Sequence, residues 1–218
     1  MTTSDASVSA QSVVSTHLWA NASSGIGVSY NPSHEPGEGT LNGPAVIQGA
    51  IATWNSVVPS SFAFVNKGTT AAEAGSCDAT IHLDGVNTIA FAPLDGQLAI
   101  TCAVFLGSGA TSQLVEFDMK ISEDASLWAS SLETPAGRFD LPSTVLHELG
   151  HAAGLSHSDA GTVMDGTLAP GVQRRNLTAD DIAGLQTAYP VKPVAIAAEV
   201  TKPGKPLFRL RAALVAFD

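Results

Sequence analysis

The sequence contains no apolar run approaching the roughly 20 residues that a membrane-spanning helix requires. Basic residues are also scarce, since ten Lys and Arg stand against twenty Asp and Glu, which gives a formal net charge of −10. A surface this acidic repels phosphate backbones. We therefore expect neither a membrane nor a nucleic acid as a partner.

The acidic excess is unevenly distributed along the 218 residues. Residues 1–190 hold five basic and eighteen acidic side chains, a net of −13, whereas residues 191–218 hold five basic and two acidic, a net of +3. The 44% hydrophobic content suffices for one substantial core. We predict one folded domain over 1–190 and an extension of unknown role over 191–218.

Hydrophobic periodicity predicts a mixture of strands and helices. One helix is expected over residues 44–58, because Ile47, Ile51, Trp54 and Val58 recur at helical spacing, and Trp54 is expected in the core. Short alternating or apolar runs predict strands. These strands cover residues 26–30, 62–65, 79–83, 98–106 and 114–121.

The most specific feature is the segment His147-Glu148-Leu149-Gly150-His151-Ala152-Ala153-Gly154-Leu155-Ser156-His157. On a helix, His147 and His151 leave the same face one turn apart, a spacing suited to chelating zinc. Gly154 allows the chain to leave the helix at positive φ, so that His157 returns as a third ligand. Two histidines at this spacing also occur on ordinary surface helices, but the added glycine and third histidine favour a metal site.

Three protein ligands leave the fourth zinc position open, which is the pattern of a catalytic rather than a structural site. The carboxylate of Glu148, next to the first ligand, can reach a zinc-bound water and serve as its general base. Upstream, Asp140 or Ser143 can cap the helix, and Pro142 is tolerated in its first turn.

Two further stretches make a family resemblance definite. A tight turn at 161–166 carries Met164, and the stretch 176–190 contains the possible capping box of Thr178 and Asp181. Together with the long histidine motif and the Ser158 that follows it, these stretches resemble the matrixins, a family within the metzincin clan of zinc endopeptidases.

The resemblance implies an α+β fold, a metzincin-type catalytic domain with a twisted, mostly parallel sheet that has an antiparallel edge strand. The sheet packs on the active-site helix, and a C-terminal helix follows. By resemblance, residues 98–106 form the edge strand, which pairs with an extended substrate, although they can equally only complete the sheet. The resemblance also places Met164 beneath the zinc as a support. It implies that Asp180 and Asp181 anchor the last helix to the methionine turn, and that Asp180 can receive a mature N-terminal ammonium group.

The expected cofactor is one catalytic Zn²⁺ held by His147, His151 and His157. A second zinc is not expected, because the other histidines are widely scattered. Calcium stays open, because hard oxygen ligands occur in the right region without any EF-hand spacing. The candidate calcium ligands are Asp84, Asp95, Glu116, Asp118, Glu123 and Asp124, and the scattered histidines are His17, His34 and His82.

The leading hypothesis is a secreted, extracellular, monomeric endopeptidase that binds a protein or peptide substrate in extended form. The alternatives are a zinc hydrolase of non-peptide amides or esters, and a catalytically silent binding module with structural zinc. Neither cysteine lies in anything like a matrixin prodomain switch, so the chain resembles a mature form. No signal peptide is visible at residues 1–5. Secretion favours a Cys77–Cys102 disulfide over two free thiols. Arg174 and Arg175 are expected to be a solvated surface pair.

Overall fold

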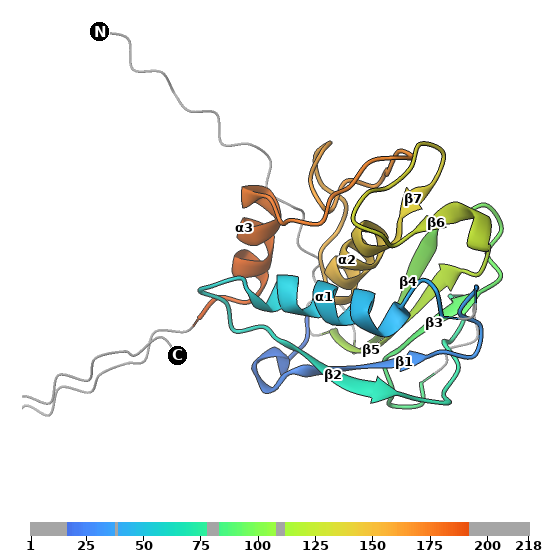
Figure 1. Cartoon of the computed structure of the whole chain (residues 1–218). Coiled ribbons are helices and arrows are strands. Elements are labelled where there is room, and N and C mark those ends of the chain that lie inside the picture. Colours follow the sequence, from blue (N-terminus) through green and yellow to red (C-terminus); the bar gives the residue numbers. More distant parts are fainter. Residues whose placement is uncertain (1–16, 38, 78–82, 108–111, 192–218) are drawn as a thin grey trace, which may run out of the picture.

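The computed structural model describes residues 17–37, 39–77, 83–107 and 112–191, which form a central sheet with helices on one face (Figure 1). The sheet has five strands in the order β2-β1-β3-β5-β4. All neighbouring pairs are parallel except β4 with β5, so β4 is an antiparallel edge strand. The strands are β1 (Ile26–Asn31), β2 (Phe64–Thr69), β3 (Thr88–Ala92), β4 (Ala99–Leu106) and β5 (Gln113–Ser122).

The interior strands are mostly buried, although β1 and β5 alternate apolar residues with small, polar or charged ones. Strand β3 is the clearest case, since four of its five residues are buried at the centre of the sheet. Strand β3 was not predicted from the sequence, because five residues without alternation look the same in a strand and in a buried loop. The strand predicted over 79–83 falls almost entirely outside the described residues.

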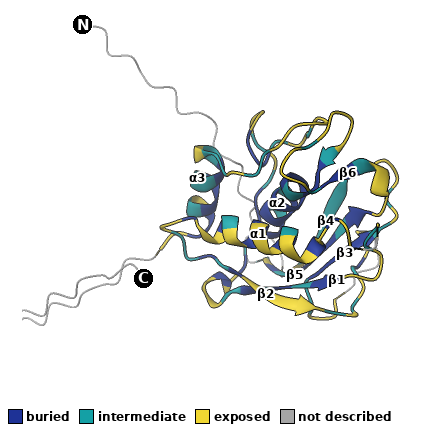
Figure 2. Ribbon diagram, viewed as in Figure 1, coloured by how far each residue is buried: buried dark blue, intermediate teal, exposed yellow. Residues whose placement is uncertain are grey.

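Two helices pack together on one face of the sheet, α1 (Gly43–Asn55) and α2 (Leu141–Ala152). Trp54 of α1 is fully buried, as predicted, and its indole N–H donates to the main-chain oxygen of Leu146 at 2.8 Å. Helix α2 is buried over most of its length, whereas the outer side of α1 is exposed (Figure 2). The helix that carries the histidine motif therefore lies in the core, beside α1 and against β4.

The last helix, α3 (Ala179–Ala188), begins with the predicted capping box, in which Thr178 and Asp181 bond each other's backbone N–H groups. It ends at Tyr189, whose hydroxyl donates to the Ala153 oxygen at 2.8 Å. The same hydroxyl accepts the backbone N–H of Trp19 at 3.2 Å. One phenol thus joins the first described segment, the end of α2 and the end of α3.

The remaining elements are short. A parallel two-stranded sheet pairs β6 (Trp128–Ala129) with β7 (Phe139–Asp140), and 3-10 turns cover η1 (Ala22–Ser24) and η3 (Ala125–Leu127). Within the described ranges no helix is long and apolar enough to cross a bilayer. The predicted α+β architecture with an antiparallel edge strand is confirmed, while the predicted extension lies outside the description from residue 192 on.

Candidate metal centre and substrate cleft

Helix α2 positions the first two histidines, and its start is fixed by a buried cap. Asp140 is the N-cap, and its side chain accepts the backbone N–H of Ser143 at 3.0 Å and the hydroxyl of the same residue at 2.5 Å. Pro142 occupies the first turn, where its missing N–H costs no hydrogen bond. Both capping expectations are confirmed, and they set which face of α2 carries His147 and His151.

Gly154 turns the chain out of α2 toward the third histidine. Its φ is +89°, a region that favours glycine. A Cβ at this position would also lie 2.8 Å from Leu18 Cδ2, so the turn is closely covered by the first described segment. Because of this turn, His157 reaches the other two histidines, and the candidate ligand atoms of the three rings lie within 4.8 Å of one another.

The imidazoles are oriented by backbone carbonyls on their far sides. Nδ1 of His147 lies 2.7 Å from the Val163 oxygen, and Nδ1 of His151 lies 2.8 Å from the Leu155 oxygen. Each Nδ1 therefore carries the proton, which leaves the Nε2 lone pair free for a metal. The two Nε2 atoms face each other at 3.0 Å, near the roughly 3.4 Å that separates two nitrogens on a tetrahedral zinc. These three residues fit a zinc ion held by nitrogen.

Burial keeps the helical imidazoles neutral, which is the form that binds metal. Desolvation lowers the pKa of His147 to about 4, with a further contribution from the neighbouring His151. Desolvation also lowers the pKa of His151, although its bond to the Leu155 oxygen opposes the shift. At neutral pH both rings therefore present a lone pair.

Glu148 is buried beside the three histidines, and a residue of the edge strand holds its carboxylate. The hydroxyl of Thr101 donates to Oε2 of Glu148 at 2.7 Å. Burial raises the pKa of Glu148, and the Thr101 hydrogen bond opposes that shift. The sequence analysis missed Thr101, because nothing local in the sequence relates two residues that are 47 positions apart.

Met164 is fully buried directly under α2. A Cβ built on Gly150 would lie only 2.2 Å from the Met164 sulfur, so glycine at this position lets helix and methionine approach each other. The backbone N–H groups of Val163 and Met164 both donate to the carboxylate of Asp181, at 3.1 Å each. Helix α3 is thereby joined to the turn that carries the methionine. Asp180 instead accepts the hydroxyl of Ser158, and the expected contact with an N-terminal ammonium group falls outside the described residues.

Arg174 and Arg175 do not form the solvated pair that the sequence analysis expected. Arg175 forms an ion pair with the fully buried Asp140, and Arg174 lies 2.8 Å from Asp165. Burial alone would raise the pKa of Asp140, but hydrogen bonds from Arg175, Ser143 and Thr134 together lower it. The prediction was wrong because Asp140 is 35 positions from Arg175 in the sequence, and Asp165 is separated from Arg174 by a turn. The sequence gives no signal of either ion pair.

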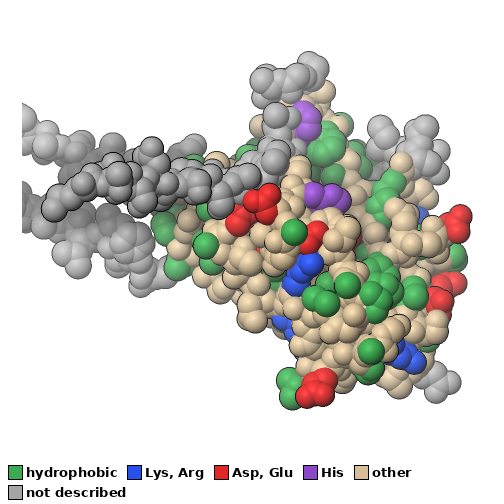
Figure 3. Space-filling model, turned by 90° about the horizontal axis from the view of Figure 1, so that it is seen from above, with side chains coloured by type: hydrophobic (Ala, Val, Ile, Leu, Met, Phe, Trp, Pro, Cys, Tyr) green, Lys and Arg blue, Asp and Glu red, His purple; other side chains and the backbone are tan. Residues whose placement is uncertain are grey.

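Two adjoining cavities run along the metal centre between β4 and α2. One, of about 390 Å³, extends over Ala103, Phe105 and Leu155, and the other, of about 300 Å³, extends over Ser143, Leu168 and Arg174. Both cavities touch a common set of residues, namely Gln97, Ala99, Glu148 and His157. Histidine side chains reach the surface on the face shown in Figure 3, with acidic and basic side chains nearby. The candidate ligands therefore lie in the middle of an open cleft.

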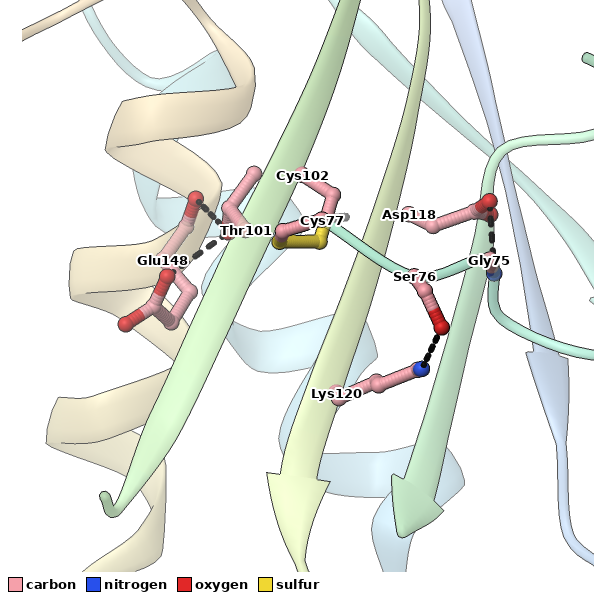
Figure 4. The surroundings of a disulfide bond; sticks show 8 residues. All are labelled: Gly75, Ser76, Cys77, Thr101, Cys102, Asp118, Lys120 and Glu148. Carbon is pink, nitrogen blue, oxygen red and sulfur yellow. Dashed lines mark hydrogen bonds between the residues drawn. A yellow bond between two sulfur atoms is a disulfide. The ribbon is translucent and has the colours of Figure 1, made fainter. Parts of the chain in front are cut away.

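The disulfide between Cys77 and Cys102 favoured by the sequence analysis is formed, with Cα atoms 5.1 Å apart. It joins β4 to a loop that crosses the sheet face opposite α2 (Figure 4). The loop is also fixed by a hydrogen bond from the Gly75 N–H to Asp118 at 2.8 Å. Asp118 also accepts the backbone N–H of Thr88.

The acidic side chains named as calcium candidates do not gather into a ligand set within the described part of the chain. There, the three histidines are the group of His, Cys, Asp or Glu arranged to hold a metal ion. The carboxylate of Glu116 instead accepts the backbone N–H groups of Asp84 and Gly85. Through these two hydrogen bonds, Glu116 fixes the loop that precedes β3.

Comparison with known proteins agrees with this geometry. The sequence model of the matrixin family matches residues 27–190, which contain α2, the methionine turn, α3 and the whole sheet except the first residue of β1. The chain belongs to the matrixin family. Metalloendoproteinase 1-MMP of Arabidopsis thaliana is 33% identical over 157 residues, which cover 68% of this chain and 38% of the relative.

Two other relatives support the same assignment. Metalloendoproteinase 4-MMP of Arabidopsis thaliana is 30% identical over 151 residues, 68% of this matrixin and 40% of the relative. Interstitial collagenase of Oryctolagus cuniculus is 32% identical over 146 residues, 66% of this chain and 27% of the relative. The chain thus spans about two fifths or less of the length of these relatives.

Proposed function

We propose that this matrixin is a secreted zinc-dependent endopeptidase that hydrolyses internal peptide bonds. One observation carries the proposal: three imidazoles converge on one point in an open cleft, and the carboxylate of Glu148 lies beside them. A purely structural zinc site is closed by four protein ligands and has no use for a neighbouring carboxylate. The matrixin assignment supports zinc as the metal.

His147, His151 and His157 would hold the ion. Zinc, when bound, polarises the scissile carbonyl and makes water more acidic. Glu148 takes a proton from the attacking water and passes it to the amine that leaves. Val163 and Leu155 keep two of the imidazoles in the tautomer that binds metal, through their main-chain oxygens.

The edge strand β4 explains how a peptide would bind through its main chain, with little dependence on most of its side chains. One side of β4 pairs with β5, and the other has no strand partner in the described sheet. An extended substrate can add to this edge through main-chain hydrogen bonds, which places its backbone along the cleft. Side-chain preference would then come from the cavity lined by Leu168 and Arg174.

The test compares the zinc-loaded protein, the same protein with a chelator, and Glu148→Gln, which keeps the shape of the side chain but removes the base. We expect the wild type to cleave casein internally, as measured by mass spectrometry of the products, and the other two samples to lose at least about 100-fold in rate. Metal analysis of Glu148→Gln must show one zinc per chain, since the ligands are intact.

Three results would overturn this assignment. Wild-type protein that carries one zinc and cleaves no protein, but hydrolyses simple esters or amides, would indicate a different hydrolase. Zinc-loaded protein without any hydrolytic activity would indicate a binding module. Full activity of Glu148→Gln would show that another group activates the water.

A further inference from the structure

We propose that Thr101 is a positioning residue, whose hydroxyl holds the carboxylate of Glu148 in the orientation needed for proton transfer. This inference rests on the proposed role of Glu148 as the general base. Thr101 lies outside the histidine motif, 47 positions from Glu148 in the sequence, and no feature of the motif points to it.

The contact is short and uses one oxygen of the carboxylate. The Thr101 hydroxyl lies 2.7 Å from Oε2 of Glu148 and 3.1 Å from the main-chain oxygen of the same residue. Its single proton is directed to the nearer, charged acceptor, which forms the stronger hydrogen bond. Oε1 has no hydrogen-bond partner among the described residues, so it stays free to accept a proton from water. Figure 4 shows the two side chains pointing toward each other.

Thr101 is itself well fixed, which a positioning residue requires. It lies within β4, opposite Met119 of β5 in the antiparallel ladder. As a β-branched residue it has few side-chain rotamers, so the direction of its hydroxyl is set by the strand. The next residue, Cys102, points to the opposite face of the sheet, where its disulfide to Cys77 ties the strand to the crossing loop.

A glutamate without such a partner has three rotatable bonds and samples several orientations. Near a reacting centre, a displacement of about 1 Å can reduce the rate by about 100-fold. Glu148 is buried, but it borders both cavities of the cleft, so space for other rotamers exists on the substrate side. The Thr101 hydroxyl selects the rotamer in which Oε2 faces the strand and Oε1 faces the cleft.

The experiment replaces Thr101 by Val, which has the same shape and suits a strand, and by Ser, which keeps the hydroxyl. A second loss-of-hydroxyl variant, Thr101→Ala, covers the case in which Thr101→Val fails to fold. All are studied as the zinc-loaded protein of residues 1–218. Thr88→Val is the matched control, because the buried hydroxyl of Thr88 has no hydrogen-bond partner among the described residues.

For Thr101→Val we expect kcat to fall by about 10- to 100-fold with KM changed by less than about threefold, since the hydroxyl acts on chemistry and not on binding. Thr101→Ser should recover kcat to within about threefold of wild type, and Thr88→Val should match wild type. An unchanged kcat in both Thr101→Val and Thr101→Ala would overturn the inference.

A second readout is independent of activity. With glutamate labelled at Cδ with ¹³C, the Glu148 signal, assigned by its loss in Glu148→Gln, should be single and narrow in the wild type. It should broaden or split in Thr101→Val and recover in Thr101→Ser. If the wild type proves to have no peptidase activity, the proposed function fails while this signal still decides the contact. An unaltered signal in Thr101→Val would refute the positioning role.

Discussion

The contact between α2 and the buried methionine predicts opposite effects for one substitution made in two helices. Gly150 of α2 and Gly49 of α1 are both in regular helix, where alanine is favoured over glycine by about 1 kcal/mol. At Gly49 an added Cβ meets nothing within 4 Å. At Gly150 it would lie 2.2 Å from the sulfur of Met164 and 2.9 Å from Cζ2 of Trp54.

The expected magnitudes follow from these distances. Gly49→Ala should raise the free energy of unfolding by about 1 kcal/mol. Gly150→Ala forces Met164 and Trp54, both fully buried, to shift, and overpacking of this kind costs about 1–3 kcal/mol. After the helix preference is subtracted, Gly150→Ala should destabilise by up to about 2 kcal/mol, so the variants should differ by about 1–3 kcal/mol.

Equilibrium urea unfolding at a fixed zinc concentration measures both variants, because metal binding itself adds to stability. The same samples should show weakened zinc binding for Gly150→Ala alone, since Gly150 lies next to His151 and the sulfur of Met164 must move. Equal stabilisation by the two alanines would refute the reasoning. It would mean that the methionine under α2 has room to give way.

Three further results are expected. Removing the disulfide by replacing Cys77 and Cys102 with serine should lower the free energy of unfolding by about 3.5 kcal/mol for a sequence separation of 25, as measured by urea unfolding, and a loss below about 1 kcal/mol would contradict the chain-entropy argument. Asp140→Asn should be destabilising at neutral pH but progressively less so in acid, because hydrogen bonds from Arg175 and other donors outweigh burial and lower the pKa of Asp140 in the folded protein. The stabilisation from the carboxylate is complete above the unfolded-state pKa of about 3.9 and disappears as the pH falls through the folded-state pKa. A difference in urea midpoints that does not change with pH would refute this. Asp181→Ala should cost about 3 kcal/mol and lower the thermal midpoint, because it leaves two buried backbone N–H groups of the methionine turn without an acceptor, and an unchanged midpoint would show that water replaces it.

The parts of the site that were predicted from sequence are those made by contacts within one or two turns of chain. The spacing of His147 and His151, the cap at Asp140 and the capping box at Asp181 all depend on residues three or four positions apart, so local geometry determines them. The order of the sheet and its edge strand came from the family resemblance, not from periodicity.

The parts that were missed depend on contacts between distant segments. Thr101 meets Glu148 only because β4 lies beside α2, and Arg175 meets Asp140 only because the chain returns from the methionine turn to the start of that helix. Strand β3 was missed for a different reason, since a short run buried on both faces carries no alternation. Distant polar partners and central strands are the features that a single sequence encodes most weakly.

The hydrogen bond between Trp19 and the Tyr189 hydroxyl bears on how the described fold could be recombined with other proteins. Trp19 and Tyr189 are 170 positions apart in sequence but joined by a hydrogen bond, so the first and last segments of the described fold meet at the end of α2. A unit of this kind can be inserted into a surface loop of another protein, or permuted by linking its ends, with a short linker.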